Sequence, residues 1–431
     1  MAIDNKDKKV LKSSIEREQN EVACSAECEK IKGSKNLNVP HLRFPEFSGE
    51  WKMATFGDIA KGFDYGMNAA AKSFDGNNKY IRITDIDEVS SQYLYDDVVS
   101  PDGELEDRYL VKENDILLAR TGASTGKSYL YRNSDGKLYF AGFLIRANIY
   151  KHNSYFVFSQ LHTLRYKKWI SVMSARSGQP GINSQEYASF PVYTTSLQEE
   201  DKIATFLKLL DERIITQNKI IEDLKKLKSA ISKHLFARKD LLETTICLSN
   251  IATLKNGYAF QSGKYNALGK WKILTITNVS GERYINDEDY NCIINLPNDI
   301  QDHQVLKEGD ILISLTGNVG RVSLCKDGDY LLNQRVGLLQ LAKNVNQEFL
   351  YQILSSQRFE NSMIACGQGA AQMNIGKGDV ESYVLPYSSN VNNILLVAKI
   401  LHSYDEYIIN EQRKLTLLTM QKQYFLAQMF I

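Results

Sequence analysis

The stretch QEEDKIATFLKLLDERIITQNKIIEDLKKLKSAISKHLFA, residues 198–237, contains neither glycine nor proline. Its apolar residues recur three and four positions apart, the spacing of a helix with one apolar face. They are Leu207, Leu210, Ile214, Ile221, Leu224, Ile231 and Leu235. Because each helical residue adds about 1.5 Å, a helix of this length would be about 60 Å long. The stretch therefore predicts a long helix whose apolar face packs against another element.

The same pattern returns 194 positions later in the chain. The apolar residues of the second copy are Leu401, Tyr404, Ile408, Leu415, Leu418, Phe425 and Met429. The interruptions also coincide, with Gln217 and Lys228 in one copy and Glu411 and Lys422 in the other. Polar residues at matching seam positions are typical of two paired helices whose register they fix. We expect an antiparallel pair; the alternative is that each helix packs only on its own domain.

The globular regions are duplicated as well. The tripeptide DIL followed by TG occurs at 115–122 and again at 310–317, and QPGI at 179–182 corresponds to QMNI at 372–375. Short β-branched runs alternate with turns and a few helical stretches, which predicts a tandem duplication of a mixed α/β domain in the α+β class. The expected segments are a disordered polar tail at 1–37, domains at 38–196 and 241–390, and long helices at 197–240 and 391–431.

The sequence TGASTGKS, 121–128, resembles a phosphate-binding P-loop but differs from it in spacing. A P-loop needs four residues between its glycines, and only three separate Gly122 from Gly126. The following residues form two alternating runs around an Asn-Ser-Asp-Gly turn, which predicts a hairpin instead of the required helix. Nucleotide binding is therefore the least favoured interpretation.

Charge is distributed unevenly along the first domain. Residues 85–115 include eleven acidic and two basic side chains, whereas residues 116–185 include ten basic side chains and a single acidic one. The corresponding part of the second domain, 311–378, has six basic and four acidic residues. Lysine and arginine bind phosphates, while neighbouring Asn, Gln and Ser side chains read base edges, so this pattern favours a DNA surface. A solvated basic face is the alternative.

Glycine-rich loops at 174–184 and 366–378 carry further side chains suited to base edges. Together with the basic segments they give the predicted DNA-binding residues Arg120, Ser124, Lys127, Arg146, Arg176, Gln179, Asn183, Asn318, Arg321, Gln334, Arg335, Gln368, Gln372 and Asn374.

No catalytic residue or metal site is predicted. Pro101-Asp102 followed by Asp135-Gly136-Lys137 loosely matches a nuclease pattern, but Asp-Gly is more typical of a turn. The six cysteines lack metal-ligand spacing. No apolar run is long enough to span a bilayer and no signal-peptide core is present, so we expect a cytoplasmic protein.

Several segments together resemble the specificity subunits of Type I restriction-modification systems. They are VPHLRFPEFSGEW, NDILLARTG, GDILISLTG, GQPGIN, AGFLIR, LNQRVG and SLQEEDKIATFLKLLDERI. The resemblance covers about residues 39–431. It implies two target-recognition domains that each read one half of a split DNA sequence, with the paired helices setting the unread spacer. The second copy departs from the pattern at NNILLVAKILHSYDEYI, where the Gln-Glu start is missing.

The resemblance also implies partners. They are double-stranded DNA, two methyltransferase subunits and restriction or translocase subunits, with S-adenosylmethionine, ATP and Mg in those partners and no cofactor in this chain. The competing interpretation is a coiled-coil scaffold that binds only protein. Such a scaffold would explain the helices but not the basic half of the first domain.

Overall fold

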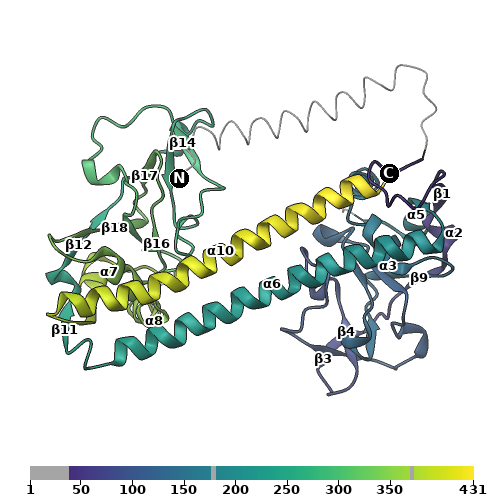
Figure 1. The fold of residues 1–431 in the computed structure, drawn as a ribbon, viewed down its shortest axis with the longest axis horizontal. Coiled ribbons are helices and arrows are strands. Elements are labelled where there is room, and N and C mark those ends of the chain that lie inside the picture. The colour runs from purple at the N-terminus through teal and green to yellow at the C-terminus, as the bar shows by residue number, and fades with distance from the viewer. Residues whose placement is uncertain (1–37, 176–180, 369–372) are drawn as a thin grey trace. The chain divides into compact units, whose positions relative to one another are not determined.

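A computed structural model describes residues 38–175, 181–368 and 373–431. These residues form two compact units, which are described separately. The first unit comprises the described residues up to Glu212 together with Leu418–Ile431, and the second comprises Arg213–Leu417. Each unit thus contains one globular region and parts of both long helices, α6 (Leu197–Ala237) and α10 (Val391–Met429) (Figure 1).

The first unit is built on a four-stranded antiparallel sheet in the order β2-β9-β6-β7, with three two-stranded sheets beside it. Of these, β1-β10 and β3-β5 are antiparallel, and β4-β8 is parallel. The strands are β1 (Lys52–Thr55), β2 (Ala60–Tyr65), β3 (Ala70–Ser73), β4 (Lys79–Ile81), β5 (Val99–Asp102), β6 (Asp115–Ala119), β7 (Ser128–Leu130), β8 (Leu138–Phe140), β9 (Leu144–Ile149) and β10 (Pro191–Thr194). The short helices are α2 (Phe56–Ile59), α3 (Ser154–Gln160), α4 (Leu164–Ser174) and α5 (Ser184–Ala188).

The second unit repeats this plan. Its four-stranded sheet has the order β12-β18-β15-β16, and it lies with the pair β11-β19 and the three-stranded sheet β14-β13-β17. The strands are β11 (Thr244–Cys247), β12 (Ala252–Asn256), β13 (Trp271–Leu274), β14 (Asn291–Ile293), β15 (Ile311–Ser314), β16 (Val322–Leu324), β17 (Tyr330–Leu332), β18 (Val336–Leu341) and β19 (Val384–Tyr387). The short helices are α7 (Gln347–Leu354), α8 (Gln357–Cys366) and α9 (Lys377–Glu381). The predicted tandem duplication of an α+β domain is confirmed.

The two long helices contact each other in each unit. In the first, Lys422 Nζ lies 2.6 Å from Asp211 Oδ1, and the rings of Phe206 and Phe425 meet edge to face at 4.8 Å. In the second, Gln217 Nε2 donates to Glu411 Oε2 at 2.6 Å, and Lys228 Nζ lies 2.5 Å from Asp405 Oδ1. Residue numbers rise along one helix as they fall along the other, so the pairing is antiparallel, as predicted.

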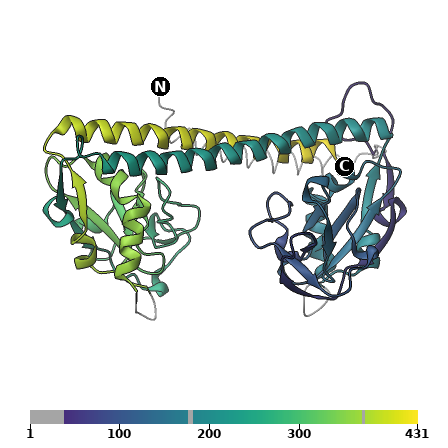
Figure 2. The same ribbon diagram turned by 90° about the horizontal axis from the view of Figure 1, so that it is seen from below.

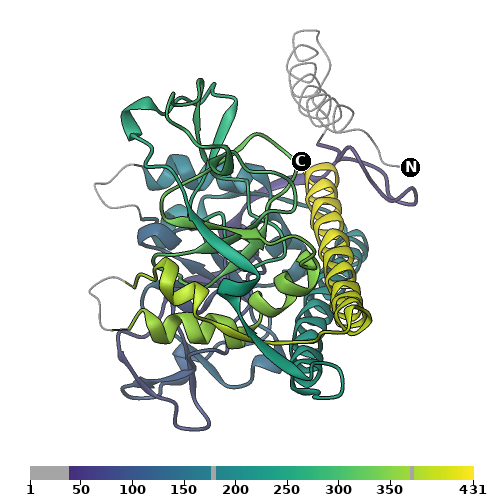
Figure 3. The same ribbon diagram turned by 90° about the vertical axis from the view of Figure 1, so that its left-hand side faces the viewer.

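The polar seam residues follow the repeat. Asp211 and Lys228 of α6 lie 194 positions before Asp405 and Lys422 of α10, so the two units contain the same ion pair with the helices exchanged. Each helix also packs on a globular core. In the first unit Ile203 and Leu207 join a core with Leu426 and Phe430, and in the second Val397 and Leu401 join another. Each long helix therefore pairs with the other long helix and also packs on a globular domain (Figures 2 and 3).

The hairpin predicted after Lys127 is wrong. Strand β7 pairs with β6, but β8 pairs with β4 in parallel and in a different sheet. The intervening turn is drawn inward by Asp135, which is 5% exposed and accepts hydrogen bonds from the hydroxyls of Tyr95 and Tyr129. The Asp135 side chain is therefore part of the domain core. Its loose match to a nuclease pattern is explained by this structural role.

Candidate nucleic-acid interface

The TGASTGKS loop follows β6 and is closed by its own hydrogen bonds. The backbone N–H groups of Thr125, Gly126 and Lys127 donate to the carbonyls of Gly122, Ala119 and Ser124. A P-loop needs such N–H groups free to hold phosphate, and it leads into a helix, whereas this loop leads into strand β7. The loop therefore lacks the geometry of a P-loop, in agreement with nucleotide binding as the least favoured interpretation.

Helix packing explains the second glycine of this loop in each copy. Gly126 and Gly320 have φ of +92° and +79°, and a Cβ there would lie 2.8 Å from Ile170 Cγ2 and 2.6 Å from Met363 Cβ. Ile170 belongs to α4, and Met363 belongs to α8. Glycine is required because the backbone is left-handed and the helix presses against it.

Three loops meet at one end of the four-stranded sheet in each unit. In the first unit the carbonyl of Arg120 accepts from the N–H of Ile182 at 2.9 Å, and its N–H donates to the carbonyl of Phe143 at 3.1 Å. In the second unit Leu315 makes the same two bonds, with Ile375 at 2.9 Å and Arg335 at 3.0 Å. The backbone thus brings together loops that are far apart in the sequence.

A fourth segment packs against these loops in each unit. It lies at the end of β2 in the first unit and at the end of β12 in the second. A Cβ on Gly66 or Gly257 would lie 2.2 Å from the carbonyl oxygen of Ala141 or Asn333, so only glycine fits. The approach places the Tyr65 ring 4.7 Å from the guanidinium of Arg120, and the Tyr65 hydroxyl accepts from Ser184 N–H at 3.2 Å. Partial burial opposes ionisation of Tyr65, but the Ser184 hydrogen bond and the charge of Arg120 outweigh it and lower the pKa of the phenol.

The predicted DNA-binding residues of the second unit are mostly exposed around this end. Asn318, Gln334, Arg335 and Gln368 are exposed, and within the described ranges none of their side chains has a hydrogen-bond or ion-pair partner. Arg321 Nε lies 3.5 Å from Glu360 Oε1. These side chains are available to a ligand at little cost.

In the first unit, three predicted residues are partly used within the loops. Arg120 stacks on Tyr65, and Lys127 Nζ lies 3.7 Å from the exposed carboxylate of Glu88. Ser124 ends a short 3-10 turn and accepts from Lys127 N–H through its carbonyl.

Three other predicted residues have structural partners. Arg146 has only 15% of its side chain exposed and donates to Asp64 at 2.7 Å and to the Leu110 carbonyl at 3.2 Å. Asn183 caps helix α5, and Asn374 Oδ1 accepts from Thr316 Oγ1 at 3.1 Å. The predicted residues Arg176, Gln179 and Gln372 lie outside the described residues. Contact with DNA remains a prediction for all fourteen residues.

Two aromatic residues at the same end escaped the sequence prediction. Tyr65 and Phe143 are 41% and 60% exposed, although large aromatic side chains are usually covered. Phe143 of AGFLIR and Arg335 of LNQRVG occupy equivalent positions in the two units. The Phe143 carbonyl accepts from the N–H of Arg120, which follows β6, and the Arg335 carbonyl accepts from the N–H of Leu315, which follows β15. Aligning the two copies would therefore have pointed to Phe143.

In the part of the chain that the structure covers, no three His, Cys, Asp or Glu residues gather as metal ligands would. Nor does any helix within those ranges have the length and apolar character needed to cross a membrane.

Comparisons with known proteins agree with this arrangement. The chain matches the Type I restriction modification DNA specificity domain twice, over residues 48–226 and 243–420. It is 25% identical over 362 residues to the specificity subunit of the Type I restriction enzyme MjaVIII from Methanocaldococcus jannaschii, covering 76% of this chain and 80% of that one.

Solved structures share the fold. The S subunit of a Type I restriction-modification system from M. genitalium matches with a TM-score of 0.56 at 16% identity, over 91% of this chain and 99% of that one. A chain from a study of assembly and conformational transition in a type I R-M system matches with a TM-score of 0.52 at 14% identity, over 91% and 99%. With both globular regions matched, the chain belongs to the Type I restriction-modification DNA specificity family and is a DNA-recognition specificity subunit.

Proposed function

We propose that each unit reads one half of a split DNA target with the end of its sheet where the loops converge. One observation carries this proposal: the same loops are assembled twice, but with different side chains. The first unit has Arg120 where the second has Leu315, and Phe143 where the second has Arg335. Leu315 is only 6% exposed, so at these positions the second unit presents Arg335 alone, whereas the first presents the partly exposed Arg120 and the exposed Phe143. This difference suits two half-sites of different sequence.

The paired helices are proposed to set the length of the unread spacer. Helix α6 is a single helix of 41 residues, or about 60 Å at 1.5 Å per residue. Because B-DNA repeats about every 34 Å, a helix of this length can separate half-sites by a turn or more. The seam pairs would fix the helix register, and with it the spacer.

Catalysis is proposed to lie in partner subunits. We propose that this chain is non-catalytic and assembles with two methyltransferase subunits and with restriction or translocase subunits. S-adenosylmethionine, ATP and Mg would be bound by those partners, in the cytoplasm. The likeness to the MjaVIII specificity subunit supports this assignment.

The proposal is tested by mapping methylated bases in the host genome with and without the gene. We expect a split adenine-methylation motif to disappear when the gene is deleted and to return when it is restored. Exchanging only the first unit's reading loops, 120–127 and 141–144, should alter one half of the motif and leave the other half unchanged. A genome whose methylation does not depend on the gene would contradict the proposal, as would a loop exchange that altered both halves.

A further inference from the structure

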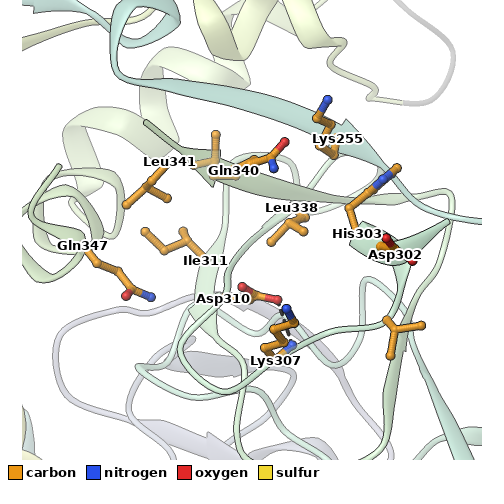
Figure 4. A pocket seen from close by; sticks show the side chains of 12 residues that line it. Lys255, Asp302, His303, Lys307, Asp310, Ile311, Leu338, Gln340, Leu341 and Gln347 are labelled. Carbon is orange, nitrogen blue, oxygen red and sulfur yellow. Dashed lines mark hydrogen bonds between the residues drawn. The ribbon is translucent and has the colours of Figure 1, made fainter. Parts of the chain in front are cut away.

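A cavity of about 570 Å³ lies on the outer side of the four-stranded sheet in the second unit. Its lining includes the apolar residues Ile311, Leu338 and Leu341, while Asp310 lies at one side beside Lys307 (Figure 4). The Asp310 carboxylate accepts from the Lys307 backbone N–H at 2.8 Å. Within the described ranges it has no side-chain partner, and burial raises its pKa.

The first unit has the same site, but there it is filled. Arg146 lies across the sheet with its guanidinium 2.7 Å from Asp64 and 3.9 Å from Asp115, donates to the Leu110 carbonyl and stacks on Phe140 at 5.2 Å. Asp115 also accepts from Asn148 at 2.7 Å and is only 1% exposed. The arginine therefore covers and neutralises a carboxylate that would otherwise face an open cavity.

Strand register shows that the two sites are equivalent. Arg146 pairs with Leu117 on β6, and Leu338 pairs with Leu312 on β15, the second residue after Asp115 and Asp310 respectively. Both aspartates accept from a lysine N–H three residues earlier, at 2.7 and 2.8 Å. Leu338 thus stands where the first unit has its arginine.

A second replacement accompanies the first. Asp64 pairs with Arg146 across β2 and β9, and Lys255 pairs with Leu338 across β12 and β18. The second unit has therefore lost the internal guanidinium and one of its two carboxylates, while the inner carboxylate, Asp310, remains. Asp310 is half-buried and accepts only the Lys307 backbone N–H among the described residues, so its carboxylate can still receive a cation from outside the chain.

We propose that this cavity is a binding site for a guanidinium group supplied from outside the chain. A guanidinium matches a carboxylate as a planar fork, and its methylene stem would lie along Leu338. Val305, which also lines the cavity, stands at the position of Leu110, whose carbonyl accepts from Arg146 in the first unit. Lys255 stands in place of Asp64, so a guanidinium in this cavity would be held by one carboxylate instead of two.

The test is a titration of the full chain with N-acetyl-arginine amide, followed by calorimetry, with N-acetyl-lysine amide as the matched probe. We expect the arginine probe to bind at least ten-fold more tightly than the lysine probe. Asp310→Asn should abolish the preference. Leu338→Arg should abolish binding by filling the cavity from within, and Leu338→Met should keep it.

Three results would overturn the proposal. They are equal binding of the two probes, undiminished binding to Leu338→Arg, and undiminished binding to Asp310→Asn. Because Leu338→Arg alone could misfold, Asp310→Asn keeps the test decisive, and thermal unfolding of each variant verifies its fold.

A second titration identifies the source of the guanidinium. If an arginine of a partner subunit occupies the cavity, the probe will bind the isolated chain but not the assembled complex. If a free guanidinium compound is the ligand, the probe will bind both. This step rests on the proposed partners, whereas titration of the isolated chain does not, so the two proposals can fail separately.

Discussion

Arg335 is exposed in the loop between β17 and β18, whereas Arg146 lies against β6 with 15% of its side chain accessible. The two arginines have the same charge but different surroundings. Arg335 has no side-chain partner in the part of the chain that the structure covers, while Arg146 lies between two carboxylates, a carbonyl and a ring. Replacing each of the two arginines by alanine should therefore have a different effect on the protein.

Arg335→Ala should weaken binding to a target duplex and lower the slope of log affinity against log salt by about 1, as for one lost phosphate contact. The free energy of unfolding of the Arg335→Ala variant should stay unchanged. Arg146→Ala should instead lower the free energy of unfolding by about 3 kcal/mol, because Asp115 is left buried without its cation. Fluorescence anisotropy and urea titrations measure the two effects. An unstable Arg335→Ala or a fully stable Arg146→Ala would contradict this division.

His162 gives the first unit a pH-dependent stability. Its Nδ1 lies 3.0 Å from the Phe158 carbonyl and its Nε2 lies 3.0 Å from Ser91 Oγ, so the neutral ring donates with one nitrogen and accepts with the other. Burial, followed by the positive charge of Lys422, lowers the pKa of His162 to about 4 from its ordinary value of 6.5. Asp211 opposes this shift and Lys167 adds to it.

The unfolded chain therefore takes up a proton at higher pH than the folded one does. Stability should be fully present above pH ~7 and should be lost as pH falls toward ~4, by on the order of 2 kcal/mol. His162→Gln should flatten this part of the stability curve. Urea midpoints measured at intervals between pH 7 and pH 4 check the prediction, and parallel curves for the two proteins would refute it.

At the scale of elements, the sequence predicted the long helices and their seam but not every sheet. Helical periodicity is a local signal, so α6, α10 and the polar position Gln217 could be predicted without knowledge of the fold. Sheet partners are non-local. Strands β7 and β8 look like a hairpin in the sequence, yet β8 pairs with β4, and Asp135 in the turn between β7 and β8 is buried. No local sequence pattern predicts this strand pairing.

Only part of the candidate interface could be predicted from the sequence. Loop composition identified Gln334, Arg335 and Asn318 as polar groups suited to DNA. It also selected Arg146, because charge counting along a chain cannot distinguish a surface arginine from one paired beneath a sheet. Phe143 was missed because an exposed aromatic residue carries no local signal of exposure.

The helix pair makes a further prediction about the spacer. Inserting seven residues immediately after Gln217 and seven immediately before Glu411, which contact each other, should preserve the apolar seam and lengthen the pair by about 10 Å. At about 3.4 Å per base pair, the unread spacer should grow by about three base pairs while both half-sites stay the same. Methylation mapping reads the outcome directly.

Insertion into α6 alone is the control, because it shifts one side of the seam against the other. It should lower stability and impair DNA recognition without giving a new defined spacer. Changed half-sites with an unchanged spacer in the double insertion would exclude the helices as the spacing element.

At the scale of the whole molecule, the first unit depends on residues from the far end of the chain. Leu426, Met429 and Phe430 are buried in its core, where the Phe430 ring lies 5.3 Å from Phe156 and 6.1 Å from Trp51. The core is therefore assembled from both ends of the described chain.

Phe430→Ala should lower the free energy of unfolding of the first unit by about 3–5 kcal/mol, the usual cost of removing a buried phenylalanine. Met420→Ala, in the helix α10 that precedes Phe430 but 59% exposed, should have almost no effect. Tryptophan fluorescence follows the transition, because Trp51 is 1% exposed and next to Phe430. Equal losses in the two variants would show that Phe430 does not support the core.

The contribution of Leu426 and Phe430 also constrains biosynthesis. Their segment is translated only after the entire second unit, so a ribosome adding about 5–20 residues per second needs roughly 10–40 s to complete the first core. During that interval the emerging first unit exposes the apolar surface that Phe430 later covers. A nascent chain that stalls within the second unit would therefore offer that surface to chaperones and proteases, and incomplete subunits would be removed before they could compete for DNA.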